Sequence, residues 1–567
     1  MYSKEKFLNQ LPFIAAWGAL SVIFAACIAA LWIHGYIGLN NDNMTLLYQT
    51  KRMLAGATLY KDLFEVAPPF IHFLYTVPVA LANVTDIPVK YTLDSFVTFL
   101  VVVSLGLCAH IAYETFKNTT HTALKTAWII APAMIALCVY SFFAEVFSDR
   151  EHLTVVLALP YLFLHAPFFQ SSKLSRIERF LIGFMIGVGS VLKPYYLILP
   201  VFVCLYTLAR RRSFLKMFTS ENWGVAAACA AFGITIYFIT PGYVQNVLPV
   251  ALETYKGALP QLSARLKHLR AEYFPYVPWF IAGFAVMALI ASARKNIANI
   301  LYLCTVLAAT TLIYSLNSGW FYTIYPFYAV SFMVMVYLFY MVVTTPLPSI
   351  YLTPATQRLV LGIFAVFIMI PAWSHFTGKF FITHIDSQIE RQSRTGYPKN
   401  YTRLRPEIRR TFEKYLTENN NQFALYGTST WATNLLQISK NAINESRFDC
   451  LWQLADFVNK EKTDQVKFTK NFLPNALADD LRNKKPGVVF VENSPEMRRL
   501  PKNFDIVSFF KKYPSFNNEW KNYRLAEKVD VCSDTKTIRC SYGIYVRKSD
   551  KDVMMSEGHK PNHIMSD

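Results

Sequence analysis

The segment 40–70 reads NNDNMTLLYQTKRMLAGATLYKDLFEVAPPF and follows the first long apolar run of the chain. Its third residue is Asp42, and a carboxylate at the exit of a membrane helix is costly unless it has a function or lies in an aqueous pocket. Asn and Asp are also preferred at helix N-caps, so position alone favours Asn41 or Asp42 as a cap for the helix that follows. The two roles are compatible, because a helix N-terminus attracts anionic groups.

Long apolar runs dominate the first two thirds of the chain. Of the 567 residues, 53% are hydrophobic, and the apolar ones gather in blocks of about 15–23 residues. A helix needs about 20 residues to cross a bilayer, so we expect a polytopic α-helical membrane protein. About eleven transmembrane helices are expected, at 11–33, 91–116, 124–143, 152–169, 178–192, 195–209, 223–240, 276–293, 298–316, 322–343 and 357–373.

Positive charge assigns the loops to the two sides of the membrane. The basic start of the chain and the loops at 170–179, 210–216 and 294–295 fall on one side of the predicted topology, which the positive-inside rule makes cytoplasmic. Most of the formal net charge of +19 is explained in this way. No zinc or RNA-binding motif accompanies the charge, so nucleic acid is not an expected partner. An odd number of crossings places the C-terminal part on the outer side.

The outer loop at 34–90 is expected to carry two helical elements. Apolar residues at helical spacing predict a surface helix over 42–56, which Gly56 ends. The apolar stretch after Pro69 is interrupted by Pro78, which favours a second surface or re-entrant element over a full crossing.

The C-terminal third has the pattern of a soluble α/β domain. Residues 1–373 are the expected membrane module, 374–550 the α/β domain and 551–567 a disordered tail. The stretches FALYG, GVVFVEN and YGIYVRK predict strands, and RPEIRRTFEKYLTENN and LPNALADDLRNKK predict helices. Cys532 and Cys540 flank a polar turn, a spacing that suits a hairpin disulfide in an oxidising compartment.

A second acidic site lies between two predicted spans on the same side as Asp42. The stretch 148–152, SDREH, places ionisable groups together at a membrane edge. One interpretation is a local salt-bridge knot in which Arg150 pairs with Asp149. The other is a second carboxylate, Asp149 or Glu151, that helps a base to accept the proton of an acceptor hydroxyl.

Basic and aromatic residues on the outer side are candidates for substrate contacts. Lys193, followed by Pro194 and Tyr195, either extends to the interface or meets a phosphate. The basic group of the loop at 241–275 suits a phosphate or lipid headgroups equally well. Trp320 and Tyr322 suit an interfacial aromatic belt or a platform for a sugar. The basic residues of the loop at 241–275 include Arg265, Lys267 and Arg270.

No nucleotide-binding or hydrolase motif is present in the sequence. P-loop, G-x-S-x-G, H-E-x-x-H and Rossmann fingerprints are all missing. A membrane enzyme with its carboxylates and lysine on the outer side therefore needs a donor that is already activated and carried by a lipid.

The chain resembles the GT-C glycosyltransferases. It is most similar to the bacterial relatives of the dolichyl-phosphate-mannose protein mannosyltransferases and to the lipid A aminoarabinose transferases. The resemblance covers about residues 1–373 and rests on the stretch 40–70 together with SDREHLTVVLALPYLF, LKPYYLILP and NSGWFYTIYP. It implies a GT-C fold, a polyprenyl-phosphate sugar donor and inverting transfer on the outer side of the membrane.

Site residues carried over from the resemblance form one set. Asp42 is implied as the catalytic base, Glu151 as the second acid with Asp149 as its rival, and Lys193 as a contact for the donor phosphate. Two departures stand out: Asn43 occupies the place of a frequent second acid, and Ser318 and Thr323 are neutral where relatives tend to be basic. The expected substrate contacts are Arg150, His152, Lys193, Tyr195, Arg265, Lys267, Arg270, Trp320 and Tyr322.

The sequence thus predicts a glycosyltransferase of the bacterial inner membrane with a periplasmic C-terminal domain. Its partners would be a polyprenyl-phosphate sugar, membrane lipids and a glycan, lipid or protein acceptor. The sequence identifies no cofactor, and a divalent cation between two carboxylates is left open. The alternative is a transporter or flippase of lipid-linked glycans, which usually shows inverted repeats and charged groups at the midplane instead of at one face.

Overall fold

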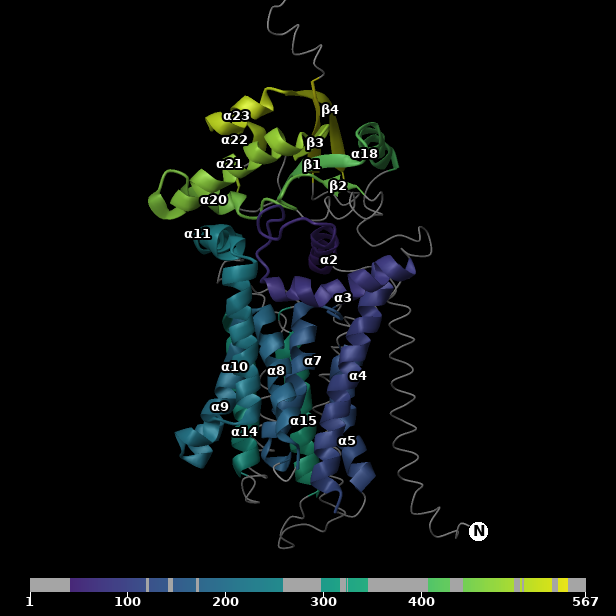
Figure 1. Ribbon diagram of the computed structural model, residues 1–567, viewed down its shortest axis with the longest axis vertical. Helices are drawn as coiled ribbons and strands as arrows, with labels where there is room; N and C mark the ends of the chain where they lie inside the picture. Colours follow the sequence, from purple (N-terminus) through teal and green to yellow (C-terminus); the bar gives the residue numbers. More distant parts are fainter. Residues whose placement is uncertain are drawn as a thin grey trace, which may run out of the picture. The chain divides into compact units, whose positions relative to one another are not determined.

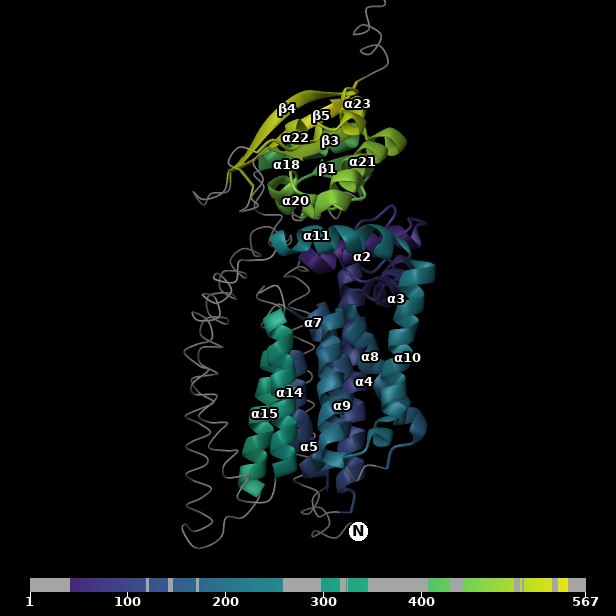
Figure 2. The same ribbon diagram turned by 90° about the vertical axis from the view of Figure 1, so that its left-hand side faces the viewer.

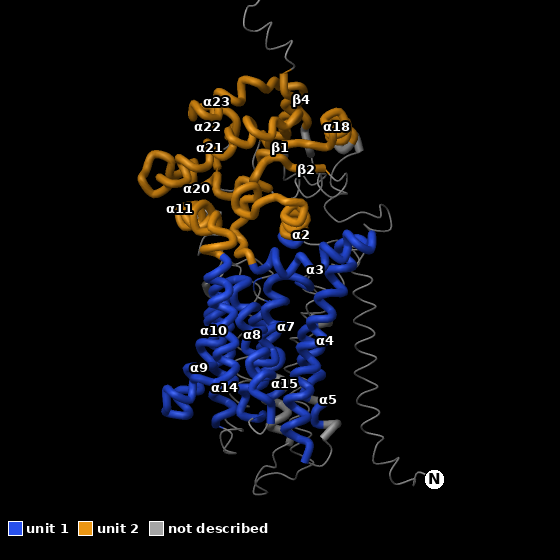
Figure 3. Tube along the Cα trace, in the orientation of Figure 1, with its two compact units in different colours: residues 1–43, 70–235, 260–396 blue, residues 44–69, 236–259, 397–567 orange. Residues whose placement is uncertain are grey.

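The computed structural model describes residues 41–118, 122–140, 146–169, 173–258, 297–316, 323, 325–344, 406–428, 442–493, 500–501, 504–532 and 539–548. The chain forms two compact units, which Figure 3 shows in different colours. Unit 1 comprises residues 1–43, 70–235 and 260–396. Unit 2 comprises residues 44–69, 236–259 and 397–567.

Unit 1 is a bundle of apolar helices. Figures 1 and 2 show α4, α7 and α8 running in the same general direction, and Figure 1 shows α3 lying crosswise to them. The helices are α3 (Pro69–Thr85), α4 (Val89–Phe116), α5 (Thr122–Met134), α7 (Arg150–His165), α8 (Arg176–Leu192), α9 (Ile198–Arg211), α10 (Ser220–Ile234), α14 (Ile297–Leu316) and α15 (Tyr325–Thr344). The π-helical segments η1 (Ile135–Tyr140) and η5 (Thr235–Ile239) continue α5 and α10, and η5 belongs to unit 2 from residue 236 on. The 3-10 turns are η2 (Pro167–Phe169), η3 (Pro194–Leu197) and η4 (Phe214–Met217).

The helices coincide with most of the expected spans. Those at 11–33, 276–293 and 357–373 lie outside the described residues, and each of the others matches a helix. Three described stretches are long and apolar enough to cross a membrane: Val89–Phe116, Ser220–Ile239 and Ile297–Tyr314. The helices α7, α8 and α9 are shorter, with 16, 17 and 14 residues, than the roughly 20 that a straight crossing needs.

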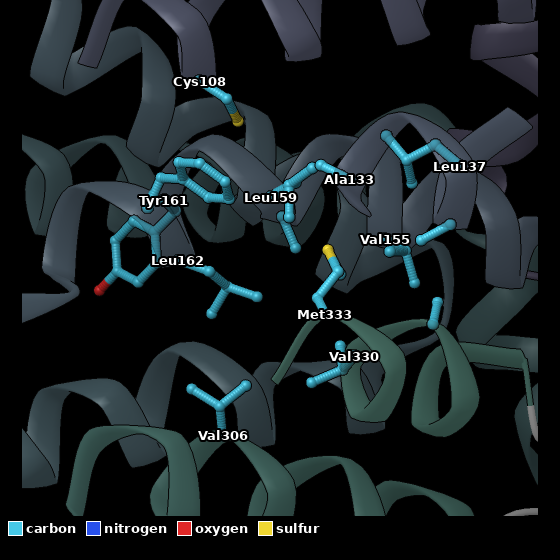
Figure 4. Close-up of a cluster of buried hydrophobic side chains, with 14 of the residues drawn as sticks. Cys108, Ala133, Leu137, Val155, Leu159, Tyr161, Leu162, Val306, Val330 and Met333 are labelled. Carbon is cyan, nitrogen blue, oxygen red and sulfur yellow. The ribbon is translucent and has the colours of Figure 1, made fainter. Parts of the chain in front are cut away.

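One apolar cluster forms the core of unit 1. Figure 4 shows it between Cys108 of α4, Leu159 of α7, Val306 of α14 and Met333 of α15, all of them buried. Lipid tails are as apolar as these side chains, so within a bilayer close packing stabilises such a cluster more than the exclusion of water does.

Small residues bring α8 and α10 into backbone contact. A Cβ atom added at Gly183 would lie 1.7 Å from the Glu221 carbonyl oxygen, and one at Gly224 would lie 2.1 Å from that of Phe180. Four positions further on, Gly187 faces Ala228 in the same way. This spacing of small residues is the usual device for close helix packing in membranes.

We therefore expect Gly183→Ala to destabilise unit 1 by at least ~1–3 kcal/mol, because the obstructing atom is backbone and cannot rotate away. The matched control is Gly233→Ala in α10, where no atom lies within 4 Å of the added Cβ. The control should be neutral or slightly stabilising, since Ala is the better helix former. Thermal unfolding in detergent measures both, and equal melting temperatures would contradict the packing described.

Unit 2 contains a five-stranded sheet in the order β2-β1-β3-β5-β4. The pairs β2–β1 and β1–β3 are parallel, whereas β3–β5 and β5–β4 are antiparallel. The strands expected at FALYG, GVVFVEN and YGIYVRK are present as β1, β3 and β5. The strands are β1 (Gln422–Tyr426), β2 (Ile443–Asn444), β3 (Val488–Glu492), β4 (Tyr523–Cys532) and β5 (Arg539–Arg547). The side chains of Cys532 and Cys540 lie outside the described part.

Helices cover both faces of this sheet, as Figure 1 shows with α18 on one side and α21 to α23 on the other. Phe423 and Leu425 pack with α18, whereas Ala424 and Tyr426 belong to the core on the opposite face. Burial on both faces explains why β1 and β3 are continuous apolar runs in the sequence. The helices of unit 2 are α18 (Pro406–Glu418), α20 (Leu454–Lys460), α21 (Lys467–Lys484), α22 (Ile506–Phe510) and α23 (Pro514–Trp520), with the 3-10 turn η10 (Asp464–Val466).

Two segments distant in sequence complete unit 2. One is 44–69, which includes most of α2 (Asn41–Leu54), and the other is 236–259, with η6 (Tyr243–Val247) and α11 (Leu248–Ala258). Phe64 stacks against Phe448 with ring centroids 4.9 Å apart, and Gln49 Nε2 donates to Asp449 Oδ2 at 2.5 Å. The helix predicted over 42–56 is present as α2, which ends before Gly56; Gly56 has φ +102°. The polar Gln49 of α2 is buried.

Glu253 of α11 caps the N-terminus of α21. Its carboxylate accepts hydrogen bonds from the backbone N–H groups of Phe468 and Thr469 at 3.0 and 2.8 Å, and from the Thr469 hydroxyl at 2.7 Å. The first N–H groups of a helix have no partner within it, so this carboxylate replaces a local cap.

We expect Glu253→Ala to lower the unfolding free energy of unit 2 by ~0.5–2 kcal/mol, the usual cost of losing an N-cap. Glu418→Ala is the control, because this acid stands in the last turn of α18, where no N-terminal amides are left unpaired. Near-ultraviolet circular dichroism on heating measures both variants. Equal melting temperatures would show that Glu253 does not stabilise α21.

Candidate active site

Asp42 is held by an arginine from α7. Arg150 Nη2 donates to Asp42 Oδ2 at 3.4 Å. Asp42 lies in the first turn of α2 and Arg150 is the first residue of α7, so the contact joins positions 108 apart. The Asp42 side chain keeps 43% of its accessible surface, whereas Arg150 keeps 12%. The local interpretation of 148–152, in which Arg150 pairs with Asp149, did not anticipate this contact.

Asn43 joins the same two elements through Asp149. Its amide Nδ2 donates to Asp149 Oδ1 at 2.6 Å. The Tyr75 hydroxyl of α3 lies 2.9 Å from both Asn43 Oδ1 and the Ser148 carbonyl oxygen. Asp149 stands at the N-cap of α7 without a side-chain capping bond. From the sequence alone, Asn43 only marks the absence of a second carboxylate. In the structure its amide is fixed by Asp149 and Tyr75, and Asn43 directly follows the candidate base Asp42.

Glu151 and Lys193 form a buried ion pair. The Lys193 ammonium donates to Glu151 Oε1, and the side chains keep 11% and 2% of their accessible surface respectively. Lys193 directly follows the last residue of α8, and η3 begins at Pro194. Burial lowers the pKa of the Lys193 ammonium, and the neighbouring Glu151 carboxylate opposes that shift. The lysine therefore lies in the interior, where a point charge acts more strongly than at the surface.

Hydrogen bonds from Ser148 to Asp94 and His152 hold the turn before α7. Ser148 has φ 72°, a left-handed conformation that is uncommon for a residue with a Cβ. Its Oγ donates to Asp94 Oδ1 at 3.2 Å, and its N–H donates to His152 Nδ1 at 3.4 Å. His152 Nε2 lies 2.8 Å from the Leu137 carbonyl oxygen, and its side chain is fully buried. His152, which the sequence predicted as a substrate contact, therefore belongs to the buried packing around this turn.

The structure brings only part of the predicted site together. Asp42, Asp149, Arg150, Glu151 and Lys193 meet at the N-termini of α2 and α7 and the C-terminus of α8. Tyr195 is partly buried, with its ring 4.9 Å from that of Tyr196. Arg265, Lys267, Arg270, Trp320 and Tyr322 lie outside the described residues.

Chemically, the cluster offers an exposed carboxylate beside buried charges of both signs. Asp149 and Glu151 are buried, so Asp42 is the carboxylate that a substrate reaches most directly. Among the residues that the structure describes, no group of three His, Cys, Asp or Glu side chains is placed to hold a metal ion. The arrangement suits proton transfer next to a group that carries negative charge.

A comparison with solved structures identifies the fold. It is the GT-C fold, so the resemblance predicted from the sequence is confirmed at the level of the fold. The matched protein is ArnT from Cupriavidus metallidurans, in a crystal structure bound to undecaprenyl phosphate. The match has a TM-score of 0.50 at 10% sequence identity and covers 93% of this chain and 98% of ArnT. No protein-family model and no curated protein sequence matches the chain.

Proposed function

We propose that this protein is an inverting glycosyltransferase that moves a sugar from a polyprenyl phosphate to a hydroxyl of a cell-envelope acceptor. The observation that carries the proposal is the exposed Asp42 carboxylate, held by Arg150 next to the buried Glu151–Lys193 pair. The GT-C fold supports it, and the undecaprenyl phosphate bound to ArnT is the kind of lipid that the reaction would release.

In the proposed reaction, Asp42 acts as general base. Its carboxylate takes the proton of the acceptor hydroxyl as that oxygen attacks the anomeric carbon of the sugar. The bond between this carbon and the phosphate oxygen breaks, and its electron pair leaves with the polyprenyl phosphate. Attack from the face opposite the phosphate inverts the anomeric configuration. No oxidant, reductant or nucleotide is needed to balance the step.

Lys193 and Arg150 are the proposed stabilisers of the leaving phosphate. Both cations are largely buried, which strengthens their interaction with a developing charge. Their carboxylate partners position them when the donor is absent. Arg265, Lys267 and Arg270 of the loop at 241–275 remain further proposed contacts for the phosphate, and Tyr195, Trp320 and Tyr322 for the sugar.

The proposed location is the bacterial inner membrane, with the reaction on the periplasmic side. The basic loops at 170–179 and 210–216 support this orientation, because positive loops stay in the cytoplasm. The acidic cluster and Lys193 lie at the opposite ends of α7 and α8, the two helices that the loop at 170–179 joins.

The decisive experiment uses the purified full chain in nanodiscs with a panel of synthetic polyprenyl-phosphate sugars. We expect time-dependent release of polyprenyl phosphate, detected by mass spectrometry, once envelope extract supplies the acceptor. The anomeric configuration of the product, read by NMR, should be opposite to that of the donor. Liposomes in which the donor crosses the bilayer intact and is never cleaved would overturn the proposal in favour of a transporter.

A further inference from the structure

A polar cavity of about 150 Å³ lies at the far end of the bundle from Asp42. It is lined by residues from four helix ends, namely the last turns of α7 and α9 and the first turns of α8 and α10. Glu151 and His165 stand at opposite ends of α7, 14 residues or about 21 Å apart at 1.5 Å per residue. This cavity is therefore separate from the candidate active site.

Buried polar atoms form the floor of the cavity. Glu221 keeps 3% of its side-chain surface, and its Oε1 lies 3.5 Å from Arg179 Nη1 and 3.8 Å from His165 Nε2. Glu221 Oε2 and His165 Nε2 are buried without a hydrogen-bond partner. An unsatisfied buried carboxylate oxygen costs several kcal/mol of solvation, so this floor suits a ligand that donates hydrogen bonds.

Arginines form the rim of the same cavity. Arg179 is partly exposed, and Arg210 and Arg211 at the end of α9 are exposed. With Glu221 the four side chains carry a net charge of +2, from three guanidinium groups and one carboxylate. Guanidinium groups bind phosphate oxygens through paired hydrogen bonds, which favours an anionic phosphate over a neutral ligand.

An apolar groove borders the polar cavity. Phe169 lines both, and Tyr206 of the polar cavity packs edge to face against Tyr302 of the groove with ring centroids 5.3 Å apart. The groove is lined only by apolar side chains and two tyrosines, from α5, α7, η2, α14 and α15. An amphiphilic molecule would place its polar group among the arginines and its hydrocarbon along the groove.

Exposed aromatic and aliphatic side chains surround this end of the bundle. Phe214, Leu215 and Phe218 follow α9, and Trp223 stands in the first turns of α10, all of them more than half exposed. Phe214 and Phe218 pack edge to face, and Phe218 packs against Trp223. Aromatic side chains near arginines are typical of the level of the lipid headgroups.

We propose that the cavity binds the head group of an anionic phospholipid that carries hydroxyl groups, of the phosphatidylglycerol type. The phosphodiester would lie between Arg179, Arg210 and Arg211, and a head-group hydroxyl would donate to Glu221 Oε2. The first methylene groups of one acyl chain would enter the apolar groove, whose volume of about 60 Å³ is too small for a whole chain. The site requires no sugar transfer and is independent of the proposed active site.

Native mass spectrometry of the full chain with defined lipids tests the proposal. Phosphatidylglycerol should be retained at least about tenfold more strongly than phosphatidylcholine, which lacks both the net charge and the hydroxyl donors. It should also exceed phosphatidic acid, which has the phosphate but no head-group hydroxyl to reach Glu221. Equal retention of all three lipids would overturn the proposal.

Two variants and a free anion complete the test. Arg179→Gln combined with Arg211→Gln should abolish the preference, whereas Arg176→Gln, an exposed arginine at the same end of α8 that does not line the cavity, should preserve it. Inorganic phosphate at millimolar concentration should leave the melting temperature unchanged. A phosphate-induced rise equal to that given by phosphatidylglycerol would make the cavity a site for free phosphate and overturn the lipid assignment.

Discussion

Replacing Asp42 by asparagine should lower the rate of sugar transfer by about 10²–10⁴-fold, the usual contribution of a positioned general base. Asparagine keeps the size of the side chain and can still contact Arg150, but it cannot take the acceptor proton. Binding of the donor should change little, because the phosphate contacts are assigned to Lys193 and Arg150. The measurement is polyprenyl phosphate release under single-turnover conditions, with donor affinity determined separately.

The matched control is Asp86→Asn. Asp86 is an exposed carboxylate in the loop between α3 and α4, so the variant makes the same change in charge outside the site. It should transfer sugar at the wild-type rate. Wild-type turnover by Asp42→Asn would remove Asp42 as the base, and a loss in both variants would point to a general effect of charge.

Breaking the Glu151–Lys193 pair should cost both stability and activity. Glu151→Leu leaves a buried ammonium without its carboxylate, and removing one partner of a buried ion pair costs roughly 3–5 kcal/mol. The partial exposure of Lys193 favours the lower end of that range. The melting temperature in detergent and the transfer rate measure the two effects.

The double variant Glu151→Leu with Lys193→Met separates the two roles. Replacing both partners by apolar side chains of similar size should restore most of the melting temperature, because no buried charge is left unpaired. Transfer should stay low, since the cation assigned to the leaving phosphate is missing. A double variant that recovers activity along with stability would show that the pair only holds the helices.

An exposed pair provides the comparison. Lys117 and Glu114 form an ion pair at the end of α4 with an N–O distance of 2.7 Å and side chains that keep 35% and 15% of their surface. Glu114→Leu should cost less than about 1 kcal/mol, because surface pairs contribute little. A cost as large as that of Glu151→Leu would mean that burial does not set the strength of these pairs.

The sequence predicted the parts of the fold that depend on local pattern. Long runs of apolar residues identified α4, α10 and α14, and short continuous apolar runs identified β1 and β3, because each pattern reports burial of the element itself. Gly56 predicted the end of α2, since its φ of +102° disfavours other residues.

Contacts between distant segments were not predictable in the same way. Asp42 and the acidic cluster 148–152 could be chosen as candidates, yet nothing local shows that Asn43 reaches Asp149 or that Tyr75 contacts Asn43 and the Ser148 carbonyl. Tyr75 lies in the apolar stretch FIHFLYTVP, where a hydroxyl gives no sign of its partner. Glu221 and His165 were missed for the same reason, because each looks like an ordinary polar residue at a helix end.

Unit 2 is assembled from three segments that lie far apart in the sequence, and this limits when it can fold during synthesis. Gln49 and Asp449 are 400 positions apart, and Glu253 caps a helix that begins 214 positions later. At about 5–20 residues per second, the first segment of unit 2 waits roughly 20–80 s for the strands with which it packs. Until then its apolar side chains, including Tyr60 and Phe64, have no core to enter. A nascent chain arrested before β3 should therefore display these side chains to chaperones, and unit 2 should depend on the segment 44–69 for its folding as well as for its final packing.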